Sequence, residues 1–339
     1  MLRDTVPRML TQAILLGTLL LLPDDALVDD GSRKLQANDA DGAIAAFDQA
    51  KKQSPKDPRP HYLSAVALQK KGDPAAAERE LKAALTLDPK LAEVRNELGA
   101  LLNERRRFAD ATVELKRAVA DKPDLTEAWF NLGQAAAMQK DCATALDAYA
   151  HALKLSATDA DGTINASVAA RRCGKLDQAT AWARQGVKLA GSSAQAHLNL
   201  GITLDAAGKL DDAVAEYTVA TRIKPDYATA WWSLGLAEQK RHKMDAAIAA
   251  LDKARTLSPT AARSADLGVA WRDKGDLAKA ATLFREALQK DPRYTPARWH
   301  LAQTLSAQHK CGDLAKELGQ LPAAEGQSAA AQKLRAACK

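Results

Sequence analysis

Small side chains recur every 34 residues along the sequence, and this period limits what the chain can fold into more than any other feature. One column holds Ala in eight consecutive periods: Ala43, Ala77, Ala111, Ala145, Ala179, Ala213, Ala247 and Ala280. Two further columns, one seven residues later and one upstream, hold only Ala, Gly or Ser. Pro55, Pro89 and Pro123 keep the same spacing, and one deletion just before Asp266 explains why Pro292 comes a residue early. A period of this length indicates a solenoid built from one repeated unit.

The pattern inside one period predicts two helices. We count offsets so that Thr126 is offset 1 of the fourth repeat. Apolar or small residues at offsets 4, 7, 8 and 11, and again at 20, 24 and 27, have helical spacing. Gly, Lys or Asp near offset 15 separates the two runs, as in "KKGDPAA" and "AAGKLDDA", and Pro at offset 32 ends the second helix. We expect the bulky residues of offset 24 to fill the space beside the small columns: Phe47, Leu81, Leu115, Tyr149, Tyr217, Leu251 and Phe284.

This pattern resembles the tetratricopeptide repeat, a helix–turn–helix unit of 34 residues, over about residues 24–325. The matching framework residues are clearest in the fourth and seventh repeats: Trp129, Leu132, Gly133, Ala145, Tyr149 and Ala152, and then Trp231, Leu234, Gly235, Ala247, Ala254 and Pro259. The fifth repeat, "DGTINASVAA", departs from the pattern because it lacks the aromatic residue, the Gly and the Pro. The resemblance implies an all-α fold, a right-handed α-solenoid superhelix of about nine stacked repeats. A C-terminal capping helix is expected over residues 326–339.

The resemblance also implies a concave groove, lined by the first helix of each repeat at offsets 2, 5, 6, 9, 12 and 13. Three consecutive repeats place an amide at offset 6: Asn131, Asn165 and Asn199. A side-chain amide both donates and accepts hydrogen bonds, so a column of amides could pair with the backbone of an extended peptide. Asn is also common at this offset as a framework residue, and the sequence leaves both interpretations open.

Offset 5 supplies candidate anchors for such a peptide. The candidates are mostly apolar: Phe130, Ile164, Leu198, Trp232 and Trp299. Rigid aromatic side chains that face a groove are good binding anchors, whereas packing against a neighbouring helix is the structural alternative. Trp232 is the sharpest candidate, because Trp231 already fills the framework position beside it.

Basic residues gather at offsets 12–16, near the turn inside each repeat. The candidates for a basic edge are Arg105, Arg106, Arg107, Arg171 and Arg172. The chain has a formal net charge of +6, and a basic edge could contact anionic lipid or cell-wall polymer. A solvated edge whose cations complement helix C-termini explains the same pattern. No aromatic residues alternate with these charges, so we expect no nucleic-acid partner.

Residues 1–23 differ from the repeats. Arg3 and Arg8 precede an apolar run over residues 13–22, which is short for a membrane span and typical of a signal-peptide core. The sequence around Ala26 makes a poor cleavage site, so a cleaved signal peptide, an uncleaved membrane anchor and an apolar helix on the first repeat all stay open. We expect an exported or membrane-anchored protein of a bacterial periplasm or cell envelope, with a cytoplasmic location as the alternative.

The four cysteines fall at related positions in the repeats. Cys142 begins a second helix and Cys173 ends the next first helix, at turns that lie side by side in this family's fold. Cys311 and Cys338 have a similar relationship near the C-terminus. We therefore expect two disulfides, 142–173 and 311–338, as suits an exported chain, with four unpaired thiols as the alternative.

No catalytic constellation is recognisable in the sequence. The six His are scattered, no phosphate-binding loop or nucleophile motif is present, and the repeats occupy almost the whole chain. We expect no enzymatic activity, no metal and no cofactor. The leading hypothesis is a scaffold that binds an extended peptide or a partner helix in its groove, within a cell-envelope complex. The second is a membrane-tethered structural or assembly factor that uses the basic edge. The oligomeric state stays open.

Overall fold

The computed structural model describes residues 26–338, and every regular element in that range is an α-helix. The residues form two compact units, unit 1 ending at Trp182 and unit 2 beginning at Ala183. The boundary lies inside helix α11 (Leu176–Leu189). The predicted signal peptide or anchor over residues 1–23 lies outside the described residues.

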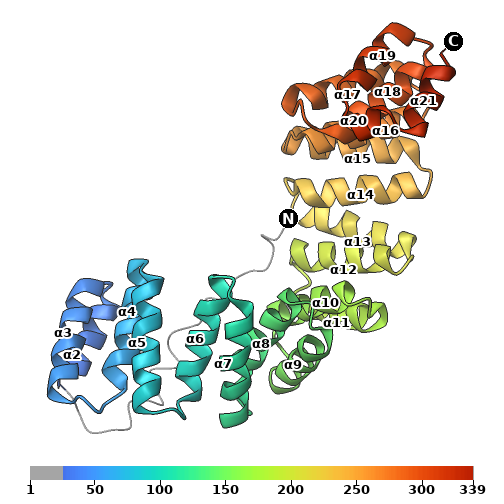
Figure 1. Ribbon diagram of the computed structural model, residues 1–339. Helices are drawn as coiled ribbons and strands as arrows, with labels where there is room; N and C mark the ends of the chain where they lie inside the picture. Colours follow the sequence, from blue (N-terminus) through green and yellow to red (C-terminus); the bar gives the residue numbers. More distant parts are fainter. Residues whose placement is uncertain (1–25, 339) are drawn as a thin grey trace. The chain divides into compact units, whose positions relative to one another are not determined.

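Unit 1 is a series of helix pairs in chain order, and Figure 1 shows each helix beside the next. The pairs are α2 (Ala26–Gln36) with α3 (Ala40–Gln53), α4 (Arg59–Lys71) with α5 (Pro74–Leu87), α6 (Ala92–Glu104) with α7 (Phe108–Asp121), and α8 (Thr126–Met138) with α9 (Cys142–Leu155). Helix α10 (Ala160–Arg172) packs against α8 and α9. We call the first helix of each repeat its A helix and the second its B helix.

Unit 2 repeats the same arrangement. Its pairs are α12 (Ala194–Ala206) with α13 (Leu210–Ile223), α14 (Ala228–Lys240) with α15 (Met244–Leu257), α16 (Ala261–Asp273) with α17 (Leu277–Lys290), and α18 (Thr295–Ala307) with α19 (Cys311–Gly319). Two short helices follow, α20 (Ala323–Gly326) and α21 (Ala329–Ala336). The prediction of an all-α solenoid of stacked helix–turn–helix repeats is confirmed.

The turn inside each repeat uses a left-handed residue at offset 15. Four of these residues are Gly, as in Gly72 at φ 81°. Among residues 26–338, five non-Gly residues also have positive φ, and all five stand at this offset: Asn38, Arg106, Lys140, His242 and His309. A left-handed residue after the A helix lets the chain reverse direction within a few residues. The predicted end of the first helix near offset 15 therefore requires a residue with left-handed backbone conformation, which Gly adopts without strain.

Close approach of the A and B helices depends on the small residue at offset 8. A Cβ atom added to Gly31 would lie 2.4 Å from the Phe47 ring, and one added to Gly268 would lie 2.7 Å from the Phe284 ring. Both rings are fully buried. The predicted packing of the bulky offset-24 residues against the small column is confirmed.

Offsets 4 and 23 form a second pair between the A and B helices of a repeat. Where offset 4 is Trp, as in Trp129 and Trp231, offset 23 is Ala, and each indole donates to a backbone carbonyl six residues earlier. Where offset 4 is basic, it meets Glu at offset 23 with nitrogen–oxygen distances of 2.6, 2.7, 2.6 and 2.8 Å: His61–Glu80, Arg95–Glu114, His197–Glu216 and Arg298–Glu317. The same two positions thus hold either Trp with Ala or a basic side chain with Glu.

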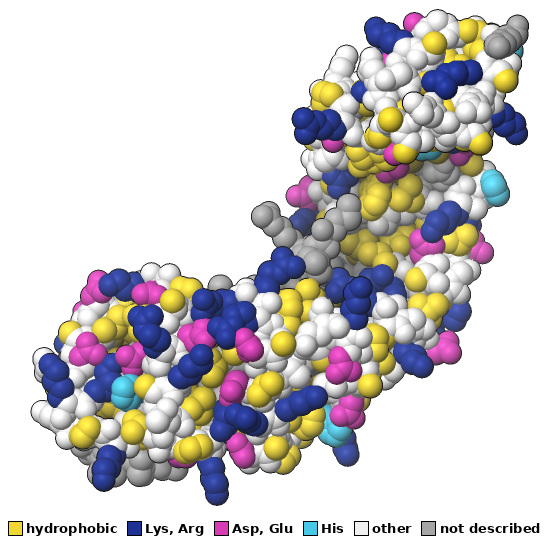
Figure 2. All heavy atoms as spheres, viewed as in Figure 1, with side chains coloured by type: hydrophobic (Ala, Val, Ile, Leu, Met, Phe, Trp, Pro, Cys, Tyr) yellow, Lys and Arg dark blue, Asp and Glu magenta, His cyan; other side chains and the backbone are white. Residues whose placement is uncertain are grey.

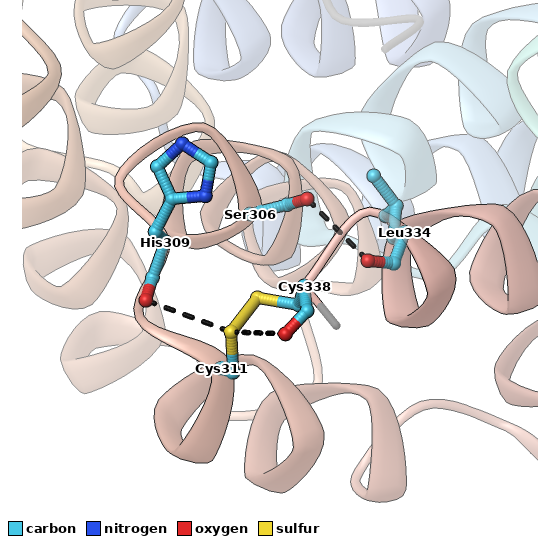
Figure 3. The surroundings of a disulfide bond; sticks show 5 residues. All are labelled: Ser306, His309, Cys311, Leu334 and Cys338. Atoms are coloured by element: carbon cyan, nitrogen blue, oxygen red, sulfur yellow. Dashed lines mark hydrogen bonds between the residues drawn. A yellow bond between two sulfur atoms is a disulfide. The ribbon is translucent and has the colours of Figure 1, made fainter.

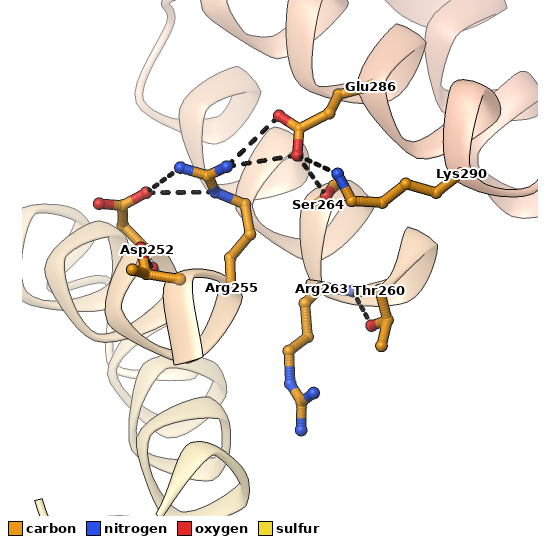
Figure 4. Close-up of polar contacts among 8 residues, drawn as sticks. Asp252, Arg255, Thr260, Arg263, Ser264, Glu286 and Lys290 are labelled. Carbon is orange, nitrogen blue, oxygen red and sulfur yellow. Dashed lines mark hydrogen bonds and ion pairs between the residues drawn. The ribbon is translucent and has the colours of Figure 1, made fainter. Parts of the chain in front are cut away.

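Arg255 joins the B helices of two successive repeats in unit 2. Its guanidinium on α15 donates to Glu286 Oε1 on α17 (3.2 Å) and to a carboxylate one turn away on its own helix. Figure 4 shows that Glu286 also accepts from Ser264 (3.0 Å) and Lys290 (2.7 Å), whereas Arg263 points away from this network. Ionic contacts between B helices therefore add to the apolar stacking of the repeats.

Both expected cysteine pairs are disulfide-bonded in the structure. Cys142 at the start of α9 joins Cys173 at the end of α10, with an S–S distance of 2.05 Å. Cys311 at the start of α19 joins Cys338 after α21, with 5.4 Å between the Cα atoms. Figure 3 shows the second disulfide beside the Ser306 hydroxyl, which donates to the Leu334 carbonyl on α21. The disulfide and this hydrogen bond hold α21 against α18 and α19.

Candidate functional site

The candidate site is the set of A-helix side chains at offsets 2, 5, 6, 9, 12 and 13, which we call the A-helix face. In unit 1 its centre is an amide network between α6 and α8. Asn131 Nδ2 donates to Asn96 Oδ1 (2.9 Å), and Asn103 Nδ2 donates to the Asn131 backbone oxygen (3.0 Å). Asn103 Oδ1 is buried, and no group among the described residues donates to it. The amide donors therefore tie two A helices together, while an acceptor on this face stays unpaired.

The three predicted amides differ in exposure. Asn131 and Asn165 are half-buried, whereas Asn199 on α12 is only 3% exposed. The structure pairs Asn131 with Asn96 of the preceding repeat, at offset 5, and not with another offset-6 amide. Asn131 and Asn165 belong to unit 1 and Asn199 to unit 2.

The apolar residues predicted as anchors fall into two groups. Phe130, Ile164 and Leu198 are buried. Phe130 packs closely on α10, since a Cβ atom added to Gly162 would lie 2.3 Å from its ring. A buried side chain of this kind contributes to stacking of successive A helices. In unit 2, by contrast, Trp232 and Trp299 are half-buried.

Trp232 and the residues around it form the polar centre of the A-helix face in unit 2. Its indole Nε1–H donates to Asp266 Oδ2 on α16 (2.7 Å), while its side chain packs against the buried cluster of Leu251, Leu267 and Ala270. Burial raises the pKa of Asp266 and lowers that of His300 on α18. Arg272 on α16 donates to the His300 ring (3.1 Å). Trp232 therefore connects the A helices α14 and α16 and keeps part of its side chain exposed.

Glu97 is a residue of this face that sequence reasoning missed. It stands on α6 at offset 6 and is only 7% exposed, and no described residue forms a hydrogen bond or ion pair with its carboxylate. Burial, followed by the negative charge of Glu104, raises the pKa of Glu97 to about 7. Glu97 could have been found from the sequence by extending the comparison at offset 6 beyond the three Asn, because this offset also holds Asp266 and His300.

The predicted basic edge is partly neutralised where three Arg follow one another. Arg105 and Arg107 both bind Glu78 on α5, the latter at 2.8 Å, and Arg107 also binds Asp110 at 2.5 Å. Arg106 is exposed in the left-handed turn position. The other two members lie at the end of α10: Arg171 and Arg172.

Other cations near the turns also meet acids of the preceding repeat. The pairs are Lys71–Asp41 (2.6 Å), Arg241–Asp211 (2.8 Å) and Lys274–Asp245 (2.5 Å). Each acid stands in the first turn of a B helix. Figure 2 shows Lys and Arg interspersed with Asp and Glu on the visible face of unit 1. Exposed pairs add little stability, but they reduce the positive field of the edge.

The described residues form neither a metal-ligand cluster nor a membrane-spanning helix. Residues 26–338 contain no group of three or more His, Cys, Asp or Glu side chains placed to hold a metal ion. No helix in that range combines the length and the apolar character that a bilayer crossing requires.

Family models of the tetratricopeptide repeat match most of the chain. One matches residues 165–228 and 198–262, and another matches residues 34–101, 68–136 and 272–338. The chain therefore belongs to the tetratricopeptide-repeat family. Proteins of this family mediate protein–protein interactions.

The chain also resembles individual proteins. It is 28% identical over 134 residues to the type IV pilus assembly protein PilF of Pseudomonas aeruginosa, which is 39% of this chain and 53% of that protein. The chain thus aligns with about half the length of this curated relative. Its fold resembles a tetratricopeptide repeat protein from Parabacteroides merdae (TM-score 0.56, 17% identity, 73% of this chain and 98% of that one). It also resembles the structure of P. aeruginosa PilF (TM-score 0.52, 22% identity, 65% and 96%). At these identities the two structures support the fold alone.

Proposed function

We propose that this protein is a non-enzymatic scaffold that binds an extended segment of a partner protein along its A-helix face. The observation that carries the proposal is the chemistry of that face. It offers hydrogen-bonding side chains that are incompletely satisfied within the chain, of which Asn103 Oδ1 is the clearest. Such groups gain stability when a ligand supplies the missing partner. An extended peptide backbone has both donors and acceptors to offer.

Unit 2 supports the same proposal with different chemistry. Trp232 and Trp299 keep part of their aromatic side chains exposed at offset 5, and large rigid side chains supply much of the energy at protein interfaces. The hydrogen bond from Trp232 to Asp266 fixes the indole orientation before a partner arrives. A preorganised anchor loses little conformational entropy on binding.

We further propose that the protein works in the cell envelope. Two disulfides join all four cysteines, and structural disulfides persist in oxidising compartments. The relative PilF is a type IV pilus assembly protein, which favours an envelope assembly as the setting. Residues 1–23 would deliver the chain as a signal peptide or membrane anchor, 24–325 would form the repeat solenoid and 326–339 would cap it. Alkylation of thiols in intact cells, before and after reduction, tests the compartment, because a cytoplasmic chain would react without a reductant.

The groove proposal is tested with the full chain and two matched variants. One carries Asn131→Ala, Asn165→Ala and Asn199→Ala, and the other reverses Arg105, Arg106 and Arg107 to Glu. Both variants must melt as cooperatively as the wild type. A partner crosslinked in native envelope fractions by the wild type and the Arg variant, but lost by the Asn variant, would support the groove. Loss in the Arg variant alone, with strong salt dependence, would instead favour the membrane-tethered structural factor that acts through the basic edge.

A further inference from the structure

Glu97 has a mostly buried side chain whose carboxylate has no partner among the described residues, and this sets it apart from its neighbours. Glu93, one turn earlier on α6, binds Lys122 at 2.6 Å, and the nearly buried Glu78 binds Lys82 and two Arg. The Glu97 carboxylate has neither an ion pair nor a hydrogen bond from any residue between 26 and 338. Burial of most of the side chain disfavours the charged form of the carboxyl, and no cation of the described chain is paired with it to offset this cost. Glu97 is thus a site where the chain alone leaves an electrostatic requirement unmet.

The surroundings of Glu97 are rich in acceptors. Asn96 and Asn103 are seven residues apart on α6, and so are Glu97 and Glu104, so an amide row and a carboxylate row run side by side along one helix. The Asn103 donor is already used on α8, while Asn103 Oδ1, on a residue only 8% exposed, has no donor in residues 26–338. Both unsatisfied groups therefore call for a hydrogen-bond donor.

The neighbouring A helices supply an aromatic ring and few available cations. Tyr62 on α4 is 4% exposed, and burial, then the charges of Glu97 and Glu93, raises its pKa. The charged groups at groove offsets or adjacent turns around this region are Asp57, Arg59, Glu93, Glu104, Lys122 and Glu127. Arg59 is engaged with Asp57 at 2.7 Å and Lys122 with Glu93. The region is acidic, and Arg59 and Lys122 are already paired.

We infer that Glu97 receives a Lys or Arg side chain from the segment that binds the A-helix face of unit 1. Charge complementarity at a mostly buried carboxylate that no cation of the described chain pairs with favours this occupant. A metal ion fits less well, because residues 26–338 hold no group of three ligands. The inference rests on the proposed function and names the chemistry that one position of the partner must have.

The test uses the full chain and a bead library of acetylated, amidated decapeptides. We expect wild-type protein to select peptides with Lys or Arg at one fixed position. For a selected Lys peptide, replacing Lys by norleucine should weaken binding at least tenfold. The Glu97→Gln variant should bind both peptides equally, while Glu325→Gln, which removes the same charge from an exposed site in unit 2, should behave as wild type. Far-UV circular dichroism and thermal melts establish that both variants are folded.

The pH dependence of peptide affinity separates direct binding by Glu97 from a purely structural role. Because Glu97 takes up a proton near pH 7, affinity for the Lys peptide should fall about tenfold between pH 8 and pH 6 in the wild type. The Glu97→Gln variant should show no such fall. Selection of peptides without basic enrichment, or basic enrichment that survives Glu97→Gln, overturns the inference and leaves the scaffold proposal standing. Failure to select any peptide overturns the scaffold proposal itself.

Discussion

Replacing Gly268 by Ala tests the packing rule on which every repeat depends. The new Cβ atom would lie 2.7, 2.9 and 3.1 Å from three atoms of the Phe284 ring. That ring is fully buried and also stacks on His300 at a centroid distance of 5.6 Å, so it cannot move aside freely. Overpacking of this kind costs about 1–3 kcal/mol. Ala is the better helix former by about 1 kcal/mol, so we expect a net loss of up to about 2 kcal/mol.

Two further variants serve as a control for the Gly268→Ala substitution and as a rescue of it. Gly312, in helix α19, has open space around its added Cβ, so Gly312→Ala should be neutral or stabilising by up to about 1 kcal/mol. The second repeat already pairs Ala65 with Leu81 at offsets 8 and 24. Adding Phe284→Leu to Gly268→Ala copies that pair, and the double-mutant cycle should show a favourable coupling of about 1 kcal/mol or more.

Hydrogen exchange of the α16 and α17 amides is the appropriate assay for these variants. A solenoid opens repeat by repeat, so a global melt averages over local changes. The reasoning predicts lower protection in Gly268→Ala, recovery in the double variant and no loss in Gly312→Ala. Equal protection in Gly268→Ala and Gly312→Ala would refute it, because the Phe284 ring would then place no limit on the size of offset 8.

Three further changes test other features of the structure. Glu97→Gln should raise the free energy of unfolding at pH 8 by about 1–3 kcal/mol, because folding raises the pKa of the carboxyl from 4.5 to about 7 and each pKa unit corresponds to about 1.4 kcal/mol. Since the folded pKa is the higher one, the wild type keeps this stability below pH 4.5 and loses it as the pH rises through 7. Urea unfolding of the two proteins should therefore nearly coincide at pH 4. A constant difference at both pH values would contradict the assignment. Arg95→Ala should cost about 2 kcal/mol, since it leaves the mostly buried Glu114 without its closest cation. Arg95→Trp with Glu114→Ala should recover at least half of that loss in the same urea assay; no recovery would show that the Trp–Ala and Arg–Glu pairs are not equivalent. Lys140 has φ 63°, a left-handed conformation that Gly adopts more easily than Lys, so Lys140→Gly should raise the free energy of unfolding by about 1 kcal/mol. Lys154→Gly, in helix α9, should lower the free energy of unfolding by a similar amount. A lower melting temperature in both variants would refute the strain at Lys140.

The sequence predicts the framework of this protein well because the framework is periodic. Each repeat imposes the same steric demands, so Gly268 and Phe284 can be paired by counting offsets, and the resulting contact is seen in the structure. The same holds for the left-handed turn residue, although Arg106 and Lys140 show that the position tolerates side chains other than Gly. The cysteine pairs follow from the same register, because adjacent repeats bring those turns together.

The binding face is harder to predict because its properties come from contacts between repeats. An offset alone does not distinguish buried Leu198 from half-buried Trp232, since both occupy offset 5 and differ in what the next A helix places beside them. Nor does the sequence show that Asn131 would use its amide on Asn96, or that Glu97 would lose most of its contact with water. The sequence also does not show which acid pairs with which cation. In the structure, Arg105 and Arg107 of the basic edge both pair with Glu78.

The most direct test of the central claim locates the partner on the surface of the protein. A photo-crosslinking amino acid placed at Ala100, which is offset 9 on the A helix α6, would sample the A-helix face. The same label at Val113, a half-exposed residue on the B helix α7, would sample the other side of the repeat. Irradiation of native envelope fractions should crosslink one partner from Ala100 and leave it uncrosslinked from Val113. Crosslinking of that partner from Val113 and not from Ala100 would contradict the claim that the A helices form the binding face.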